Sequence, residues 1–288
     1  MKAQTIPFVT LFFALLWASP AFGQTAPPTL EVESTTPLNP KTILVLGDSH
    51  SMGHFGKAIH KGLKSQYPEA KVTLVAACGK GESGFLSGGY AHCGVITYKP
   101  NGRISRPKGC KKNPCTEADG PECSEQGCRP KKLRHYLRRL KPDLVVLQMG
   151  SNSWFKGSLK RGWPKVEKKV SKIASLIDKA GAQCLWVTPP DSSKRPTDSQ
   201  DAFAEVYERV LEGRCEVFNS RPAHHPYMDF AKAIETAGKR AKRNDGTHYG
   251  TLGPYGKTIQ EQWVADILMQ VKAMTASPVP QDDFIEQK

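Results

Sequence analysis

Ser49 ends the stretch ILVLGDS, residues 43–49, in which four apolar residues run into Gly47-Asp48-Ser49 and the sequence turns small and polar. A serine hydroxyl is a weak nucleophile at neutral pH, so it needs a base to take its proton and a third group to orient that base. Asp245 and His248 lie three residues apart in NDGTH. On a turn, this spacing lets the carboxylate reach the imidazole Nδ1 and leaves Nε2 free to face Ser49. The three residue types predict nucleophilic attack by Ser49, with His248 as base and Asp245 as its orienter.

An oxygen that gains negative charge during such an attack needs hydrogen-bond donors. The backbone N–H groups of Ser49 and Gly81 are candidates, and the side-chain amide of Asn152 is a third. Gly81 lies in the glycine-rich segment 79–89 and has no side chain to obstruct a close approach. Each segment alone has a simpler interpretation, such as a turn, a helix cap or a surface pair. Their combination predicts a site.

Apolar runs and periodic patterns predict the elements that position these residues. Strands are expected at 41–47, 71–78, 143–149, 182–188 and 215–219, and helices at 54–66, 131–140, 165–180, 202–211, 226–240 and 254–274. Apolar strands separated by helices predict an α/β fold with a parallel sheet covered on both faces. Because sites in such sheets form at the carboxyl ends of strands, the residues that follow 41–47, 71–78 and 143–149 should lie together.

The segment 91–130 differs from its surroundings, since it holds five of the eight cysteines and few large apolar residues. An Asn-Gly turn in YKPNGRIS, residues 98–105, predicts a hairpin within it. An even number of cysteines in an exported chain favours disulfides, although a zinc site at Cys110, Cys115, Cys123 and Cys128 is the alternative. Cys184 and Cys215 begin successive strands and are candidates to pair. The expected disulfide-bonded cysteines are Cys78, Cys93, Cys110, Cys115, Cys123, Cys128, Cys184 and Cys215.

The N-terminus has the features of a secretory signal peptide at residues 1–23: a charged start, an apolar run, and Ala21-Phe22-Gly23 before Gln24. A proline-containing leader at 24–40, a domain at 41–274 that includes the insertion 91–130, and a mobile tail at 275–288 are expected to follow. No later stretch has the length and apolarity of a membrane span. The expected location is therefore the periplasm or the extracellular space.

The 288-residue chain has a formal net charge of +14, and its basic residues concentrate at 99–112, 129–141, 156–172 and 238–243. Any single run is most simply a solvated surface, but together they favour an anionic partner. Nucleic acid is not expected, because no nucleic-acid-binding motif is present and aromatic residues do not alternate with the basic runs. A monomer is expected.

The four segments together resemble the SGNH (GDSL-type) hydrolase superfamily of esterases, lipases and carbohydrate deacetylases. GDSH at 47–50, CGKGES at 78–83, MGSNS at 149–153 and DGTH at 245–248 match its four blocks in order, and the resemblance covers about residues 41–274 without the insertion. It implies a flavodoxin-like three-layer α/β/α sandwich with a central five-stranded parallel sheet. It also implies Ser49, His248 and Asp245 as catalytic residues, Ser49, Gly81 and Asn152 as the oxyanion hole, and no metal or cofactor. His50 and Ser153 depart from the usual Leu and Asp of the family.

The resemblance does not define the substrate. A polar, basic insertion favours a small acyl group on a large polar carrier, so we expect a serine esterase that removes O-acetyl groups from a polysaccharide such as peptidoglycan. The alternatives are a lysophospholipase or general lipolytic esterase, an acyltransferase, and a non-catalytic carbohydrate-binding protein. His50, His54 and Trp154 are possible substrate-binding residues.

Overall fold

The computed structural model describes residues 38–91, 94–105, 128–154, 159–241 and 244–276. The predicted signal peptide 1–23, nearly all of the leader 24–40 and residues 277–288 of the tail lie outside these ranges. So do Cys93, Cys110, Cys115 and Cys123 of the insertion, and the side chain of Trp154.

Seven strands form one sheet in the order β4-β3-β2-β1-β5-β6-β7. Its strands are β1 Thr42–Gly47, β2 Lys71–Ala77, β3 Val95–Tyr98, β4 Ile104–Ser105, β5 Leu144–Gln148, β6 Gln183–Val187 and β7 Glu216–Phe218. The five strands predicted from apolar runs are all present and pair in parallel. Their order, β2-β1-β5-β6-β7, is that of flavodoxin-like folds, and the chain reverses its direction of winding at β1.

The two further strands come from the cysteine-rich insertion and make the sheet mixed instead of purely parallel. β3 pairs antiparallel with β2 and β4 with β3. The predicted hairpin forms at the Asn-Gly turn, where the Lys99 N–H donates to the Arg103 carbonyl at 2.9 Å and Gly102 has a φ of +78°. Val95 and Ile96 are buried, so the hairpin extends the sheet because its first strand supplies apolar residues to the core.

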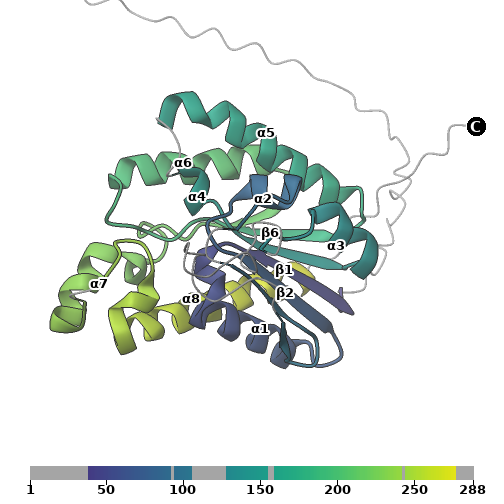
Figure 1. Ribbon diagram of the computed structural model, residues 1–288, viewed down its shortest axis with the longest axis horizontal. Coiled ribbons are helices and arrows are strands. Elements are labelled where there is room, and N and C mark those ends of the chain that lie inside the picture. The colour runs from purple at the N-terminus through teal and green to yellow at the C-terminus, as the bar shows by residue number, and fades with distance from the viewer. Residues whose placement is uncertain (1–37, 92–93, 106–127, 155–158, 242–243, 277–288) are drawn as a thin grey trace, which may run out of the picture. The chain divides into compact units, whose positions relative to one another are not determined.

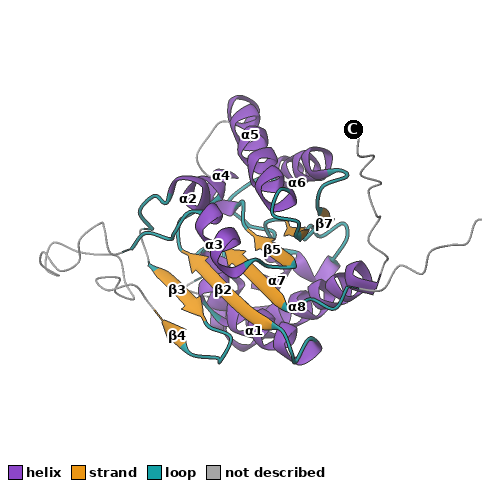
Figure 2. Cartoon of the chain, turned by 90° about the vertical axis from the view of Figure 1, so that its right-hand side faces the viewer, coloured by secondary structure: helices purple, strands orange, loops and turns teal. Residues whose placement is uncertain are grey.

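Helices cover both faces of the sheet (Figures 1 and 2). One face packs against α1 His54–Gln66, α7 Phe230–Ala237 and α8 Gly253–Ala276, and the other against α2 Glu82–Ser87, α3 Leu133–Leu140, α5 Leu159–Asp178 and α6 Thr197–Leu211. Alternate β1 residues serve the two cores: Ile43 and Val45 point to the first, Leu44 and Leu46 to the second. None of the helices in the described ranges has both the length and the apolarity that a bilayer span requires.

Five short helical turns in the described residues connect these elements. They are η1 Ser49–Met52, α4 Ser151–Trp154, η3 Pro226–Met228, η4 Gly238–Ala241 and η5 Tyr249–Leu252. The sequence predicted no helix in the glycine-rich segment, yet α2 forms there because its Glu82 and Phe85 side chains are fully buried.

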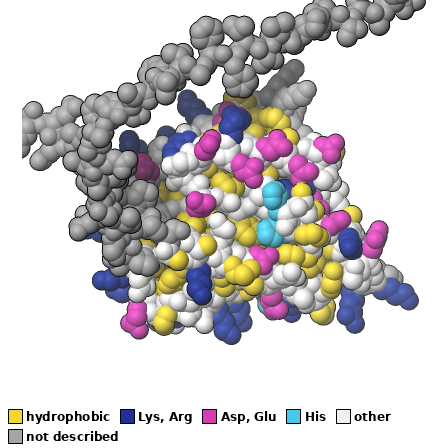
Figure 3. Space-filling view, turned by 180° about the vertical axis from the view of Figure 1, so that it is seen from behind, with side chains coloured by type: hydrophobic (Ala, Val, Ile, Leu, Met, Phe, Trp, Pro, Cys, Tyr) yellow, Lys and Arg dark blue, Asp and Glu magenta, His cyan; other side chains and the backbone are white. Residues whose placement is uncertain are grey.

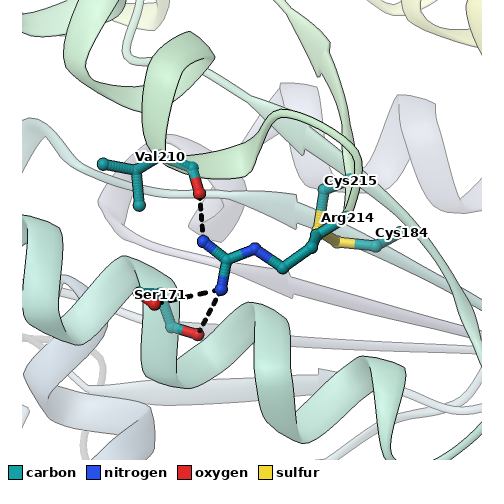
Figure 4. Close-up of a disulfide and its surroundings, with 5 residues drawn as sticks. All are labelled: Ser171, Cys184, Val210, Arg214 and Cys215. Atoms are coloured by element: carbon teal, nitrogen blue, oxygen red, sulfur yellow. Dashed lines mark hydrogen bonds between the residues drawn. A yellow bond between two sulfur atoms is a disulfide. The ribbon is translucent and has the colours of Figure 1, made fainter.

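Cys184 and Cys215 form a disulfide between the starts of β6 and β7, with their Cα atoms 4.6 Å apart (Figure 4). This pairing agrees with the prediction from neighbouring strands. The adjacent Arg214 side chain donates to Ser171 Oγ of α5 at 3.0 Å and to the Val210 carbonyl of α6, so it links two helices beside the disulfide. Cys78 and Cys128 are also disulfide-bonded. All four cysteines in the described ranges are therefore oxidised, as predicted, while the other four lie outside these ranges.

Candidate active site

Ser49 begins the 3-10 turn η1 immediately after β1. Asp48 caps this turn, and its Oδ1 accepts a hydrogen bond from the His50 N–H at 3.0 Å. The Asp48 N–H in turn donates to the Gln148 carbonyl at the end of β5, at 3.1 Å. The serine therefore projects from a tightly held turn at the carboxyl edge of the sheet.

Ser49, His248 and Asp245 lie in one hydrogen-bonded chain. Ser49 Oγ is 2.8 Å from His248 Nε2, and His248 Nδ1 is 2.6 Å from Asp245 Oδ2. The second carboxylate oxygen of Asp245 accepts from the backbone N–H groups of His248 and Thr247, at 2.8 and 3.0 Å. Because both of its oxygens are engaged, the carboxylate has a defined orientation and holds the imidazole with Nε2 toward Ser49.

The Asp245 carboxyl remains ionised at neutral pH. Partial burial acts to raise its pKa, but the hydrogen bonds from the His248 ring and backbone outweigh burial and hold the pKa well below its usual value. An ionised Asp245 would stabilise a protonated His248 ring.

Replacing Asp245 with asparagine should keep the backbone hydrogen bonds but remove the negative charge. The amide would also favour the wrong tautomer of His248, so we expect kcat for ester hydrolysis to fall by about 10³ to 10⁴. Steady-state kinetics on an aryl acetate measure this effect. A decrease of less than tenfold would contradict the role of Asp245 as orienter.

Gly81 and Asn152 follow the two strands that flank β1. Gly81 immediately precedes α2 after β2, and Asn152 lies in α4 after β5, where its side-chain amide donates to the Lys80 carbonyl at 3.3 Å. A Cβ on Gly81 would lie only 2.7 Å from Ser153 Oγ, so a side chain here would displace that hydroxyl group. The absence of a side chain at Gly81 leaves room for Ser153 Oγ between the segments expected to carry the oxyanion donors.

A buried carboxylate that the sequence did not suggest joins these two segments. Glu82 is fully buried and accepts hydrogen bonds from Ser153 Oγ and from the Tyr207 hydroxyl of α6. Burial and the neighbouring Glu82 raise the pKa of Tyr207 well above its usual value, so this hydroxyl remains a donor. Ser153, which departs from the family's usual Asp, therefore contacts an acidic side chain supplied by the glycine-rich segment.

Glu82→Gln should loosen this junction, because the amide replaces one of two acceptor oxygens with a donor. Gly81 and Asn152 are the chain neighbours of the joined residues, so we expect kcat to fall by about tenfold to a hundredfold with a small change in KM. Tyr207→Phe should cause a smaller loss of the same kind. Full kcat in a folded Glu82→Gln variant would show that the carboxylate only supports packing.

Asp48 carries a second buried carboxyl group at the site. Its burial raises the pKa from 3.8 to about 6. Folding therefore disfavours the charged form, and the stability of the protein should decrease as the pH rises from about 4 to 6, by about 3 kcal/mol at most. Asp48→Asn should remove this dependence.

The free energy of unfolding in urea, measured for both proteins at pH 4 and pH 8, tests this prediction. The stability of Asp48→Asn relative to the wild type should be greater at pH 8 than at pH 4. An equal difference at the two pH values would contradict the raised pKa.

The loop that carries Asp245 and His248 is held by residues of α6 and of the segment between β6 and α6. The Gly246 carbonyl accepts from Ser192 Oγ at 2.7 Å and from the Ser193 N–H at 3.1 Å. Gln200 contacts Ser192 through both ends of its amide and also accepts from Arg221 at 2.8 Å. These contacts connect the loop to the protein core.

Arg221 is the centre of that connection. Its guanidinium is 98% buried and forms ion pairs with Asp191 at 2.8 Å and Asp201 at 2.7 Å. Asp191 also accepts from the Phe230 N–H at 2.9 Å, at the start of α7. No sequence pattern indicated this group, because its members are spread over 191–246 without a motif.

A cavity of about 380 Å³ adjoins Ser49 and His248. Two of the predicted substrate-binding residues, His50 and His54, line it. His50 is 97% buried and its ring centre lies 4.6 Å from that of His248, whereas His54 is more exposed and pairs with Glu261 at 2.9 Å. Trp154 ends α4, and its side chain lies outside the described part of the structure. Within that part, no cluster of three or more His, Cys, Asp or Glu side chains has an arrangement that could hold a metal ion.

No protein-family model and no curated protein matches the chain. Among solved structures, it is similar to a peptidoglycan O-acetylesterase, at 15% identity and a TM-score of 0.48, over 81% of this chain and 91% of that one. It is also similar to the acetyl-xylooligosaccharide esterase Axe2 from Geobacillus stearothermophilus, at 13% identity and a TM-score of 0.48, over 79% and 94%. A third is the esterase EstA from Pseudoalteromonas sp., at 16% identity and a TM-score of 0.42, over 81% and 97%.

The strand order of the sheet and the arrangement of Ser49, His248 and Asp245 agree with the class to which the four sequence blocks point. That class is the SGNH-type serine hydrolases.

Proposed function

We propose that the chain is an exported serine esterase that removes O-acetyl or similarly small acyl groups from a polysaccharide such as peptidoglycan. The single observation that carries the hydrolytic part is the continuous hydrogen-bonded chain from Ser49 Oγ through His248 to Asp245. A binding protein has no need of a serine hydroxyl held by an oriented imidazole.

The reaction proceeds in two steps. His248 takes the proton of Ser49, whose oxygen attacks the ester carbonyl, and the backbone N–H groups of Ser49 and Gly81 together with the Asn152 amide stabilise the oxyanion. His248 then gives its proton to the departing alcohol, and an acyl-serine remains. Water activated by His248 attacks the acyl-serine, releases the acid and restores Ser49.

The positive net charge of the chain and its expected export both favour a polysaccharide as the substrate. The net charge of +14 suits an anionic polymer. On the face seen in Figure 3, however, lysine and arginine side chains lie among acidic ones and form no continuous basic area. Disulfides among the described cysteines, together with the features of residues 1–23, support export to an oxidising compartment.

The experiment that tests this function compares acyl groups on one alcohol. Hydrolysis of 4-nitrophenyl acetate, butyrate and octanoate should decline with chain length, and acetate should be released from O-acetylated peptidoglycan, in both cases only with Ser49 intact. Preference for octanoate would indicate the lipolytic alternative. Acetylated sugar acceptors in place of free acetate would indicate an acyltransferase.

A further inference from the structure

The cavity beside the catalytic residues lies on one side of Ser49. His248, Gly250 and Thr251 of the C-terminal loop line it, together with Met52 and Val95, whereas Gly81 and Asn152 do not. The cavity is therefore on the side of the base. The segment that carries Gly81 reaches it only through Cys78, and neither of the proposed oxyanion donors Gly81 and Asn152 lines it.

The mechanism of ester cleavage determines which part of the substrate lies on the His248 side of Ser49. The imidazole must deliver its proton to the leaving oxygen of the ester, so the alcohol departs next to His248 Nε2. This step rests on the proposed function. If Ser49 is acylated as proposed, the cavity on the His248 side receives the alcohol and not the acyl group.

Two buried polar side chains in the cavity lack hydrogen-bond partners in the described part of the chain. His50 is 97% buried, and neither of its ring nitrogens has a partner. Gln260 of α8 is 96% buried, and its Oε1 has none either. Leaving such a group unpaired costs about 1–3 kcal/mol, and buried polar groups in proteins are normally paired. Both side chains line the same cavity, so one bound molecule could contact both.

The chemistry of these side chains indicates what they bind. Burial, followed by the nearby His248, lowers the pKa of His50 well below its usual value, so the ring is neutral and presents one donor and one acceptor. Gln260 Oε1 is an acceptor. A hydroxyl group both donates and accepts, so it matches this pair better than an anion, which only accepts. Met52 and Val95 add apolar surface suited to the carbon atoms of a sugar ring.

We propose that this cavity is the alcohol subsite of the enzyme, in which His50 and Gln260 bind free hydroxyl groups of the sugar that carries the ester. The subsite then selects sugar esters over esters of simple alcohols by contacts made on the leaving-group side.

The test compares kcat/KM for a mono-O-acetylated glucopyranoside, which has free hydroxyls, with that for 4-nitrophenyl acetate, whose alcohol has none. Gln260→Met and His50→Phe should each lower the ratio of the two values by about threefold to tenfold, the effect of losing one hydrogen bond to substrate. Gln262→Met is the matched control, because Gln262 is exposed on the same helix. It should leave the ratio at its wild-type value.

The outcomes are distinguishable. A ratio within twofold of the wild type in both cavity variants would overturn the subsite while leaving the esterase reaction intact. An equal decrease in Gln262→Met would overturn it as well, since the effect would not depend on the cavity. Absence of Ser49-dependent hydrolysis of 4-nitrophenyl acetate would instead overturn the proposed function, and the subsite with it.

Discussion

Replacing Ser49 with alanine is expected to lower kcat for acetyl ester hydrolysis by about 10⁴ to 10⁶. The variant keeps His248, Asp245 and the proposed oxyanion donors but has no atom to form the acyl intermediate. Only the much slower attack of water on a bound ester remains. KM should change little, because the Ser49 hydroxyl contacts His248 and contributes little surface to substrate binding.

Two controls define this result. Ser87→Ala changes an exposed serine of α2 and should leave kcat at the wild-type value. Thermal unfolding of Ser49→Ala should resemble that of the wild type, because Ser49 lies at the cavity and outside both hydrophobic cores. Ester hydrolysis by Ser49→Ala at more than a tenth of the wild-type rate would show that another group performs the attack.

Replacing Arg221 with leucine should destabilise the protein by about 3 to 5 kcal/mol. The change leaves Asp191 with a buried charge that has lost its cation, and it frees Gln200 and Ser192 from the arrangement that supports the Gly246 carbonyl. The variant should therefore also lose activity at temperatures where it remains folded, because the loop that carries Asp245 and His248 is less well held.

Chemical denaturation measures the loss of stability in Arg221→Leu, and a substitution of the exposed Arg209 serves as the matched control. Arg209 pairs with Glu167 at 2.7 Å, but its side chain is 63% exposed. Arg209→Leu should cost about 1 kcal/mol or less, since exposed ion pairs contribute little. The double variant Arg221→Leu with Asp191→Asn should recover part of the loss, because no unpaired charge remains. Equal effects of Arg221→Leu and Arg209→Leu would contradict the structural role of the buried pair.

The fold could be predicted from sequence where apolar runs and turn residues agree. The five parallel strands carry nearly continuous apolar residues, and α1 lies at the predicted residues 54–66. The Asn-Gly turn predicted the hairpin but not its partner, because its pairing with β2 depends on which sheet edge is open. α2 was missed because glycine and serine disfavour helices in isolation, while the burial of Phe85 and Glu82 stabilises one here.

Some residues of the candidate site could likewise be predicted from the sequence, and others could not. Ser49, Asn152, Asp245 and His248 belong to short segments whose residue types indicate their chemistry. Arg221 and Gln260 lie outside any such pattern. Glu82 lies within the block 78–83, but its contacts with Ser153 and Tyr207 form only when distant segments meet. Ser153 with Glu82 illustrates the difference: the sequence shows only that Ser153 replaces a usual Asp, whereas in the structure the two side chains join the segments that follow β2 and β5.

Covalent labelling tests the central claim, that Ser49 is a nucleophile activated by His248. The protein should react with one equivalent of an alkyl fluorophosphonate and lose activity in proportion, and peptide mass spectrometry should place the adduct on Ser49. Ser49→Ala should not be labelled, and Asp245→Asn should be labelled far more slowly than the wild type. Stoichiometric labelling at another residue, or an active protein that resists the reagent, would contradict the mechanism.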